Sequence, residues 1–411
     1  MKPLFISHHS DDDAAVDSLF DELRLRGLRS WVDHRNGFFL GDSQAAVARR
    51  IIMDECSGFA LYARAQNGHC AALESRPFIR NVEIPAALDA VDADSTYIVF
   101  PLLCGLSYPD LREVSLQTLG EDLSVNHGCQ MEHGEGALRS AMLASRALLR
   151  KFLARDRATS AVKTRLDLSF YSHEEMPASA SDSISLDWTG ALDHLGCRPG
   201  FSSDRLLPAL MDVRREISRA FGSLTLRIGG TLHLSVAVAL GRVFAAPTRF
   251  HFEMEQNGEI WSTACPRRDN VFFSVRGEDG DVSSGDLFVG VSATRHNIRQ
   301  AVRAYVRRTE RQPREYVWFQ SLSGLADDAL PANGDCCTAA KQVADVIAAK
   351  VPSLGTQRIH LFISAPQSLA AMIGRNMNAL PEIQTYEFQG GHYYPSLALE
   401  DKYLEPEVGA R

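Results

Sequence analysis

The chain has 411 residues, of which 45% are hydrophobic and 23% are charged, with a formal net charge of -8. This length allows two or three domains, and the lack of a basic surplus excludes tight binding of long nucleic acid through counterion release. No secretory signal or run of ~20 apolar residues is evident, so we expect a cytoplasmic protein without membrane contact. The eight cysteines include no Cys-x-x-Cys pair, and we expect reduced thiols.

The first region alternates strands and helices. Strands are predicted at 3–7, 28–33, 58–63 and 96–105, and helices at 11–27, 44–56 and 82–91. Because the strands are continuous apolar runs, this alternation indicates an α/β fold with a parallel sheet covered on both faces.

The pattern changes after about residue 108, where a polar loop leads into a helix over 136–159 with a basic end. A second α/β region follows. Its helices are predicted at 204–222, 232–244, 295–308, 337–351 and 367–380, and its strands at 224–230, 249–255, 286–294, 315–322, 358–366 and 383–390. Three similar passages of strand, small polar turn and helix suggest two stacked Rossmann-like units.

Polar residues follow the first strand in "FISHHSDDD". Together with "GLRSWVD" and "SRPFIRNVE", this passage resembles the TIR domain of prokaryotic immune proteins, over about residues 1–125. The resemblance implies a flavodoxin-like fold that either cleaves NAD+ or serves as a scaffold. Phe78 departs from the pattern, since many relatives carry Trp there.

Cleavage of the nicotinamide–ribose bond releases a neutral pyridine, so one carboxylate that stabilises the oxocarbenium-like ribose suffices. Glu83 fits this role. Pro85 is tolerated in a first helical turn, which predicts that Glu83 lies near a helix N-terminus and stays ionised. A glutamate at such a place is often only a favourable charge; the TIR resemblance favours catalysis, with Glu74 as the second candidate.

The same resemblance implies contacts to NAD+ or to a neighbouring protomer. The candidates are Ser7, His8, His9, Ser10, Trp31, Asp33, Arg35, Phe39 and Ser75. Simpler interpretations stay open: Ser10 or Asp11 as a helix cap, solvated histidines, and Trp31 as a core residue. Metal ligation by His8 and His9 is not expected, because the sequence offers no evident third ligand.

The second half, 161–411, resembles the SAVED domain, a sensor of cyclic oligonucleotides in the bacterial anti-phage systems called CBASS. The passages that carry the resemblance are "DLFVGVSATRHNIRQAVRAYV", "RIHLFISAPQSLAAMIGRNMN" and "IQTYEFQGGHYYPSLAL". SAVED domains resemble two fused CARF-like Rossmann units. The domain prediction is therefore a TIR domain at 1–125, a helical connector at 126–160 and a SAVED domain at 161–411.

A ligand with several phosphates and bases suits the turns at the starts of the helices, where unpaired N–H groups bind anions and glycines allow close approach. Aromatic rings can stack on bases and arginines can pair with phosphates. The candidates are Phe201, Arg227, Gly229, Gly230, Ser292, Thr294, Arg295, Ser364, Pro366, Arg375 and Tyr394. Each could instead be a cap, a core residue or a solvated side chain, so the prediction applies to the turns as a group.

Joined, the two resemblances imply an effector in which a cyclic oligonucleotide, with cyclic tri-adenylate favoured, drives head-to-tail oligomers or filaments. A loop at 33–42 of one protomer would complete the Glu83 site of the next, and NAD+ would be hydrolysed without a metal. One alternative is a non-enzymatic, ligand-controlled scaffold. Another is a nucleoside-processing enzyme whose chemistry lies in the Rossmann-like half, although that half has no evident nucleophile–base set or Walker motif.

Overall fold

A computed structural model describes residues 1–36, 44–66, 69–132, 134–159, 163–177, 184–193, 196–256, 258–266, 268–294, 298–326 and 333–400. The chain divides into two compact units. The first contains Met1–Val162, Ser179–Leu186 and Arg215–Ala220, and the second contains Lys163–Ala178, Asp187–Arg214 and Phe221–Arg411. In the described ranges, no helix has the length and apolar character needed to cross a membrane.

The first unit is built on a parallel sheet in the order β2-β1-β3-β5-β6. Its strands are β1 (Leu4–Ser7), β2 (Ser30–Trp31), β3 (Gly58–Gln66), β5 (Ile98–Cys104) and β6 (Cys129–Met131), and β4 (His69–Cys70) pairs antiparallel with β3. β1 and most of β3 and β5 are buried, as expected of strands covered on both faces. The predicted parallel α/β arrangement is confirmed.

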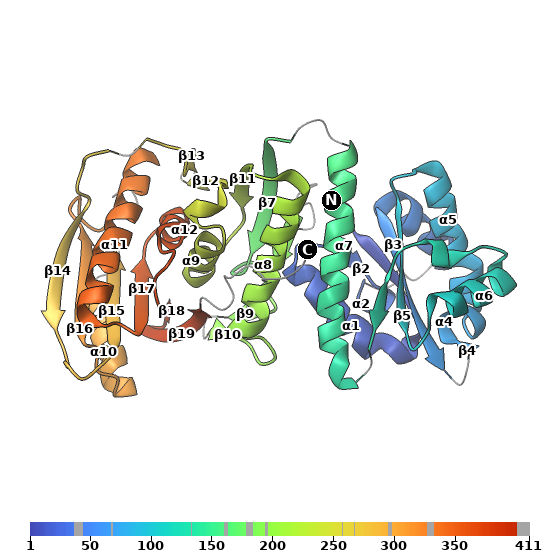
Figure 1. The fold of residues 1–411 in the computed structure, drawn as a ribbon, viewed down its shortest axis with the longest axis horizontal. Coiled ribbons are helices and arrows are strands. Elements are labelled where there is room, and N and C mark those ends of the chain that lie inside the picture. The colour runs from blue at the N-terminus through green and yellow to red at the C-terminus, as the bar shows by residue number, and fades with distance from the viewer. Residues whose placement is uncertain are drawn as a thin grey trace. The chain divides into compact units, whose positions relative to one another are not determined.

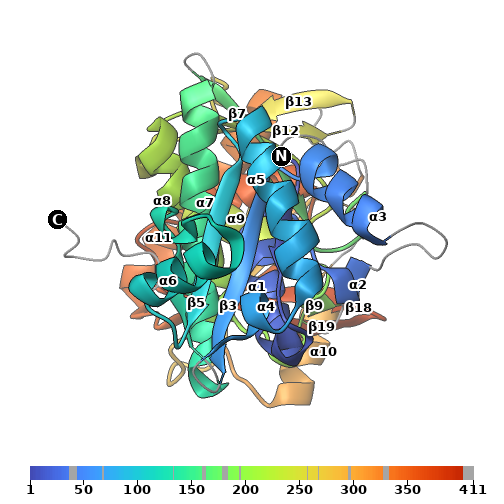
Figure 2. The ribbon, with the colours of Figure 1, turned by 90° about the vertical axis from the view of Figure 1, so that its right-hand side faces the viewer.

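Helices cover both faces of this sheet. They are η1 (Ser10–Asp12), α1 (Asp13–Leu25), α2 (Asp33–Asn36), α3 (Gln44–Arg50), η2 (Ile51–Glu55), α4 (Ala71–Glu74), η3 (Ile79–Glu83), α5 (Ile84–Ala93), α6 (Tyr108–Leu119), η4 (Leu123–Val125), η5 (Gly134–Gly136) and α7 (Ala137–Thr159). Figure 1 shows α1 and α7 on one face and α5 on the other, and Figure 2 looks onto the α5 face. On that face Ile84 and Ala87 of α5 join Phe59 and Leu61 of β3 in one core.

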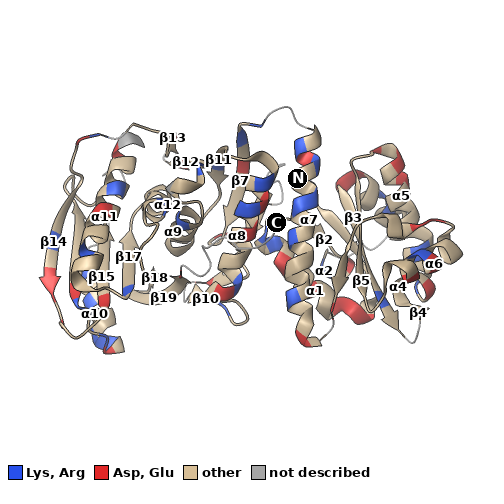
Figure 3. Ribbon diagram, viewed as in Figure 1, with Lys and Arg blue, Asp and Glu red and all other residues tan. Residues whose placement is uncertain are grey.

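Lys and Arg residues recur along α7, as the blue segments of its ribbon show (Figure 3). Glu216, whose side chain is fully buried, accepts hydrogen bonds from Arg146 Nε at 3.1 Å and Arg150 Nε at 2.9 Å. Burial alone would raise the pKa of Glu216, but the hydrogen bonds from Arg150 and Arg146 outweigh it and hold the pKa below its ordinary value. Part of the positive charge of α7 is therefore neutralised inside the first unit.

In its described residues, the second unit contains two large sheets and one two-stranded sheet. The first runs β13-β12-β11-β7, with β7 (Arg165–Tyr171), β11 (Thr225–Gly229) and β12 (His251–Gln256) parallel and β13 (Glu259–Ser262) antiparallel. The second runs β14-β16-β15-β17-β18-β19, from β14 (Phe273–Asp279), β15 (Asp286–Ser292), β16 (Glu315–Ser321), β17 (Arg358–Ser364), β18 (Glu382–Gln389) and β19 (His392–Leu399). The inner strands β15 to β18 are parallel, and β14 and β19 pair antiparallel at the edges. β9 (Leu192–Asp193) and β10 (Gly196–Cys197) form the antiparallel two-stranded sheet, and the short strand β8 (Ile184–Asp187) belongs almost entirely to the first unit.

The helices α9 and α12 lie between these two sheets (Figure 1). The helices of this part of the chain are α8 (Ser203–Phe221), α9 (Leu234–Val243), η6 (Ala246–Thr248), α10 (Arg299–Thr309), α11 (Asn333–Leu354) and α12 (Gln367–Asn376). A Cβ on Gly241 would overlap the carbonyl oxygen of Ala371, and one on Gly374 would overlap that of Val238. The two glycines therefore allow the α9 and α12 backbones to touch.

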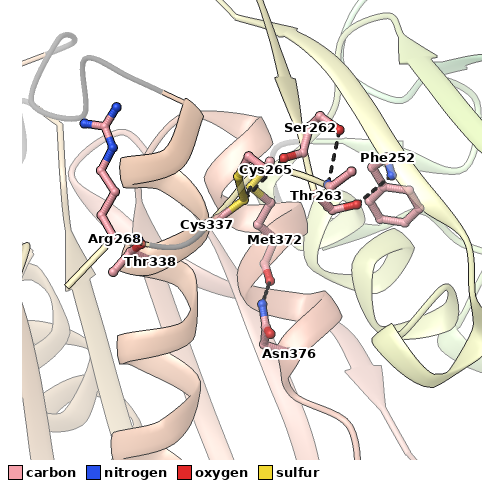
Figure 4. The surroundings of a disulfide bond; sticks show 10 residues. Phe252, Ser262, Thr263, Cys265, Arg268, Cys337, Thr338, Met372 and Asn376 are labelled. Carbon is pink, nitrogen blue, oxygen red and sulfur yellow. Dashed lines mark hydrogen bonds between the residues drawn. A yellow bond between two sulfur atoms is a disulfide. The ribbon is translucent and has the colours of Figure 1, made fainter. Parts of the chain in front are cut away.

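A disulfide links Cys265, in the turn after β13, to Cys337, near the start of α11 (Figure 4). This bond corrects the expectation of reduced thiols for these two cysteines, whereas the other six cysteines are free, as expected. The two residues are 72 positions apart in the sequence, and only the packing of β13 against α11 brings them together.

Candidate functional site

The carboxylate of Glu83 lies against the C-terminal end of β1. Ser7 Oγ donates a hydrogen bond of 2.6 Å to Glu83 Oε2, and Glu83 is only 5% exposed. Burial raises the pKa of Glu83 to about 7; the Ser7 hydrogen bond opposes this shift, and the negative charge of Asp33 adds to it. The group therefore titrates near neutral pH.

The structure corrects the prediction that Glu83 lies at a helix N-terminus. Helical structure is already present at residues 77–78, and Glu83 ends the π-helical turn η3, which runs directly into α5. Pro85 has no N–H, and its ring crowds the carbonyl four residues earlier, so a widened π turn just before it accommodates the ring. The helix dipole acts only within the first turn, so burial controls the pKa of Glu83 instead.

His8 is not a solvated side chain. Its side chain is 2% exposed, and Nε2 lies 2.9 Å from Asp13 Oδ1 and 3.9 Å from Asp33 Oδ1. His34, one residue after Asp33, places its ring 5.0 Å from that of His8. The end of β1 therefore carries a cluster of two histidines and two carboxylates beside the Ser7–Glu83 pair.

The short helix η1, which follows β1, has a different N-cap from the one that the sequence suggests. His9 Nδ1 accepts the N–H of Asp11 at 3.1 Å, so His9 is the cap of η1 and neither Ser10 nor Asp11 has that role. The hydroxyl of Ser10 instead accepts a hydrogen bond from Arg76.

Arg76 and Arg64 are basic residues at this site that sequence reasoning missed. Arg64, in β3, places Nε 2.5 Å from Oδ1 of Asp12, whose side chain is 1% exposed. The two arginines thus hold the loop after β1 at Ser10 and Asp12. Nothing in the sequence distinguishes them from solvated arginines, because their partners come from tertiary packing.

Two of the predicted NAD+ contacts serve other interactions. Trp31 stacks on Phe5 with ring centroids 4.8 Å apart, which agrees with the simpler interpretation of a core residue. Arg35 Nε donates a 2.6 Å hydrogen bond to Asp17 of α1.

Glu74, the second catalytic candidate, belongs to a local network. It accepts the N–H of Cys70 and lies 3.1 Å from Nδ1 of His69. Ser75 follows it at the exposed end of α4. Phe39 lies outside the described residues.

In the second unit, the predicted turns after β15 and β17 meet. Ser292 and Ser364 are register partners, and Thr294 Oγ1 lies 2.9 Å from Ser364 Oγ. The N–H groups of Ala293 and Thr294 donate to the Ser364 carbonyl at 2.8 and 3.1 Å. These N–H groups are therefore not unpaired, which corrects the prediction for this turn. Arg295 is outside the described part of the chain.

Gln367, which the sequence analysis did not single out, joins the turns of the two Rossmann-like units. Its Nε2 donates to the Gly230 carbonyl at 3.2 Å, and its Oε1 accepts the N–H of Leu232 at 3.1 Å. Pro366 precedes it as the N-cap of α12. Gly230 has φ 105°, and a Cβ there would overlap the Phe170 carbonyl, so local packing already requires this glycine.

The N-terminus of α9 holds a carboxylate of the chain itself. Glu387 Oε1 accepts the N–H of Ser235 at 2.7 Å. Burial raises the pKa of Glu387, and hydrogen bonds from Ser235 and Leu234 oppose that shift. Gly229 lies in open space at the preceding strand end. The helix start that follows the predicted Gly229–Gly230 turn is therefore occupied by Glu387.

Arg375, another predicted ligand contact, lies apart from these turns. It lies near the far end of α12, where Nη1 donates to the Phe244 carbonyl at 2.7 Å. Burial lowers the pKa of Arg375 to about 10.

The structure places three further predicted ligand residues in separate surroundings. Arg227 lies within β11. The Arg205 guanidinium covers the Phe201 ring at 4.3 Å, and that of Arg308 covers Tyr394 at 5.2 Å. Among the predicted set, the structure therefore groups Ser292, Thr294, Ser364, Pro366 and Gly230.

The chain is similar to sensor proteins of known families. Residues 209–399 match the SAVED family, described as the SMODS-associated and fused to various effectors sensor domain. The CD-NTase-associated protein 4 of Acinetobacter sp. (strain ATCC 27244 / 9458) is 24% identical over 175 residues, covering 43% of this chain and 36% of that protein. The protein of the same name from Moraxella osloensis is 24% identical over 246 residues, covering 58% and 48%. The chain thus spans between about a third and a half of the length of these curated relatives.

The fold is also similar to a solved receptor. The Acinetobacter baumannii Cap4 SAVED/CARF-domain containing receptor, with the cyclic trinucleotide 2'3'3'-cAAA, has a TM-score of 0.51 and 15% identity, covering 88% of this chain and 98% of that chain. At this identity the likeness concerns the fold alone. The SAVED match over residues 209–399 agrees with the resemblance expected for the second half of the chain, and the bounds 161–411 stay a prediction.

Proposed function

We propose that the chain is an anti-phage TIR–SAVED effector, in which the SAVED domain binds a cyclic oligonucleotide and the first unit hydrolyses NAD+. The observation that carries the proposal is the buried Glu83 carboxylate, hydrogen-bonded to Ser7 at the carboxyl edge of a parallel sheet. The order β2-β1-β3-β5-β6 supports it, because flavodoxin-like sheets have this order and bind ligands beside their first strand.

Cleavage of the nicotinamide–ribose bond requires few catalytic groups from the protein. The electrons of the breaking C–N bond leave with nicotinamide, and positive charge develops on the ribose, where an ionised carboxylate stabilises it. Ser7 holds Oε2, so Oε1 is the oxygen we assign to the ribose. Water then adds to the sugar and loses a proton, which yields linear ADP-ribose; attack by the adenine instead would yield a cyclised product.

Activity in this proposal depends on assembly. Glu83 is almost inaccessible in the single chain, so substrate needs a rearrangement of the site. The Cap4 receptor of A. baumannii is solved with a cyclic trinucleotide of adenine, and we propose the same class of ligand here. Its binding favours head-to-tail association, and residues 33–42, of which 37–42 lie outside the described part of the chain, then complete the Glu83 site of the next chain.

The burial of Glu83 also favours a second candidate, a ligand-controlled scaffold without turnover. In that case the Ser7–Glu83 hydrogen bond only attaches η3 to β1.

A fluorescent NAD+ analogue distinguishes the two candidates. Incubated with a panel of cyclic di-, tri- and tetranucleotides at pH 8, the full chain should turn over the analogue only with a cyclic trinucleotide. Glu83→Gln should lower this rate by at least about 100-fold, since it removes the charge that stabilises the transition state. Glu74→Gln is the matched control and should keep the rate, because Glu74 is committed to Cys70 and His69.

Turnover that survives Glu83→Gln would contradict the assigned catalytic residue. Equal turnover without any cyclic nucleotide would contradict the switch. Growth in light scattering with ligand, without consumption of the analogue, would establish the scaffold.

A further inference from the structure

Four side chains at the end of β1 and the starts of α1 and α2 present metal-binding atoms to one another. His8 Nε2 lies 2.9 Å from Asp13 Oδ1 and 3.9 Å from Asp33 Oδ1. His34 Nδ1 lies 3.6 Å from each of the same two oxygens. The ligand atoms of His8, Asp33 and His34 all lie within 4.8 Å of one another. The three ligands besides His8, which the sequence did not reveal, thus come from α1 and α2.

Three of these separations are near those around a tetrahedral ion, and the fourth, 2.9 Å between His8 and Asp13, is a direct hydrogen bond that the ion would replace. With bonds of about 2.0–2.1 Å to nitrogen and oxygen, neighbouring ligand atoms around zinc lie about 3.3 Å apart. The two 3.6 Å separations are close to this value. The 3.9 Å separation can shorten by rotation of Asp33, whose side chain is 46% exposed.

A further carboxylate orients His34 toward the cluster. Asp17 Oδ1 lies 2.9 Å from His34 Nε2 and accepts a hydrogen bond from Arg35 Nε at 2.6 Å. This contact leaves Nδ1 of His34 facing Asp13 and Asp33. Carboxylate–histidine–metal arrangements of this kind fix the tautomer and ring orientation of metal-binding histidines.

Charge and ligand type favour a late first-row divalent cation. Asp13 and Asp33 contribute two negative charges, which one divalent cation balances when both histidines are neutral. Imidazole nitrogens suit zinc and its neighbours, whereas calcium and magnesium prefer all-oxygen sites. We propose that His8, Asp13, Asp33 and His34 form a binding site for such a cation, with Zn2+ as its representative.

A binding measurement tests this site without any assay of NAD+ hydrolysis. The full chain is freed of metal with a chelator and titrated with Co2+, whose visible absorption distinguishes tetrahedral from octahedral coordination. We expect one equivalent of tetrahedral Co2+, which one equivalent of Zn2+ displaces. His34→Gln and Asp33→Asn should each weaken binding by at least about tenfold, and Asp17→Asn should weaken it through the orientation of His34.

His69→Gln is the matched control, because His69 is an exposed histidine beside a carboxylate of the same unit and lies outside the cluster. It should leave the Co2+ spectrum and affinity unchanged. Circular dichroism checks that the variants fold, and Asp33 and His34 are partly exposed, so their replacement leaves the core intact. Octahedral Co2+ only, no binding, or unchanged binding in both His34→Gln and Asp33→Asn would overturn the proposal.

Discussion

At the scale of single residues, the end of β1 shows how burial changes a carboxyl group. Glu83 keeps one hydrogen bond, from Ser7, and is otherwise shielded from water. Its pKa rises from 4.5 to about 7, with burial as the main cause. Between these two values the folded chain therefore binds more protons at Glu83 than the unfolded chain does, and stability falls as the pH rises through this window.

We therefore expect Glu83→Gln to stabilise the first unit at pH 8 and to have little effect at pH 4.5. The difference between about 7 and 4.5 corresponds to on the order of 3 kcal/mol above pH 7, since each unit of pKa is about 1.4 kcal/mol. Urea unfolding at the two pH values measures the effect, with Glu74→Gln as the control. A stability change that is the same at both pH values would show that ionisation of Glu83 is not its cause.

The sequence alone identified some residues of the Glu83 site but not others. Ser7, His8 and Glu83 follow or face a strand end, and that position is readable from the alternation of strands and helices. Arg64 and Arg76 have no such signal, because their partners Asp12 and Ser10 are distant in the sequence.

At the scale of elements, apolar periodicity predicted the buried strands well, as β15 and β17 show. It missed β14, an edge strand with exposed polar residues, and β19, which contains Pro395. It also missed β7, whose buried and exposed residues alternate and whose polar positions resemble a loop. The π turn η3 left no periodic signal, and only Pro85 hints at it.

The contact of α9 with α12 gives a prediction at this scale. Gly374→Ala should destabilise the second unit by about 1–3 kcal/mol, because the new Cβ overlaps the Val238 carbonyl oxygen and forces the helices apart. Urea unfolding followed by far-ultraviolet circular dichroism measures the change. Gly229→Ala is the control, since its Cβ would meet open space. A rise in stability from the better helix propensity of alanine would contradict the close contact.

At the scale of the whole molecule, the disulfide between Cys265 and Cys337 restricts the conformations of the unfolded chain. The Cys265–Cys337 bond closes 72 residues and connects the end of the first sheet of the second unit to α11. Such a cross-link limits the conformations of the unfolded chain, and the folded state gains stability from that restriction.

We expect Cys337→Ser to lower the free energy of unfolding by about 2–4 kcal/mol. A reductant should lower the stability of the natural chain by a similar amount and leave that of Cys337→Ser unchanged. Cys336→Ala is the control, because the neighbouring thiol is free and its loss keeps the cross-link. Non-reducing peptide mapping that finds no Cys265–Cys337 peptide would contradict the bond.

The hydrogen bond between Glu387 and the first turn of α9 has a consequence for which anions can bind there. A carboxylate that is part of the same chain is present at a high effective concentration, so a free anion must compete with it for the same N–H groups. In the proposed function, a cyclic oligonucleotide that reaches this helix start would have to displace Glu387, and its contacts elsewhere would offset that competition. Orthophosphate, which has no such further contacts, should then bind more weakly.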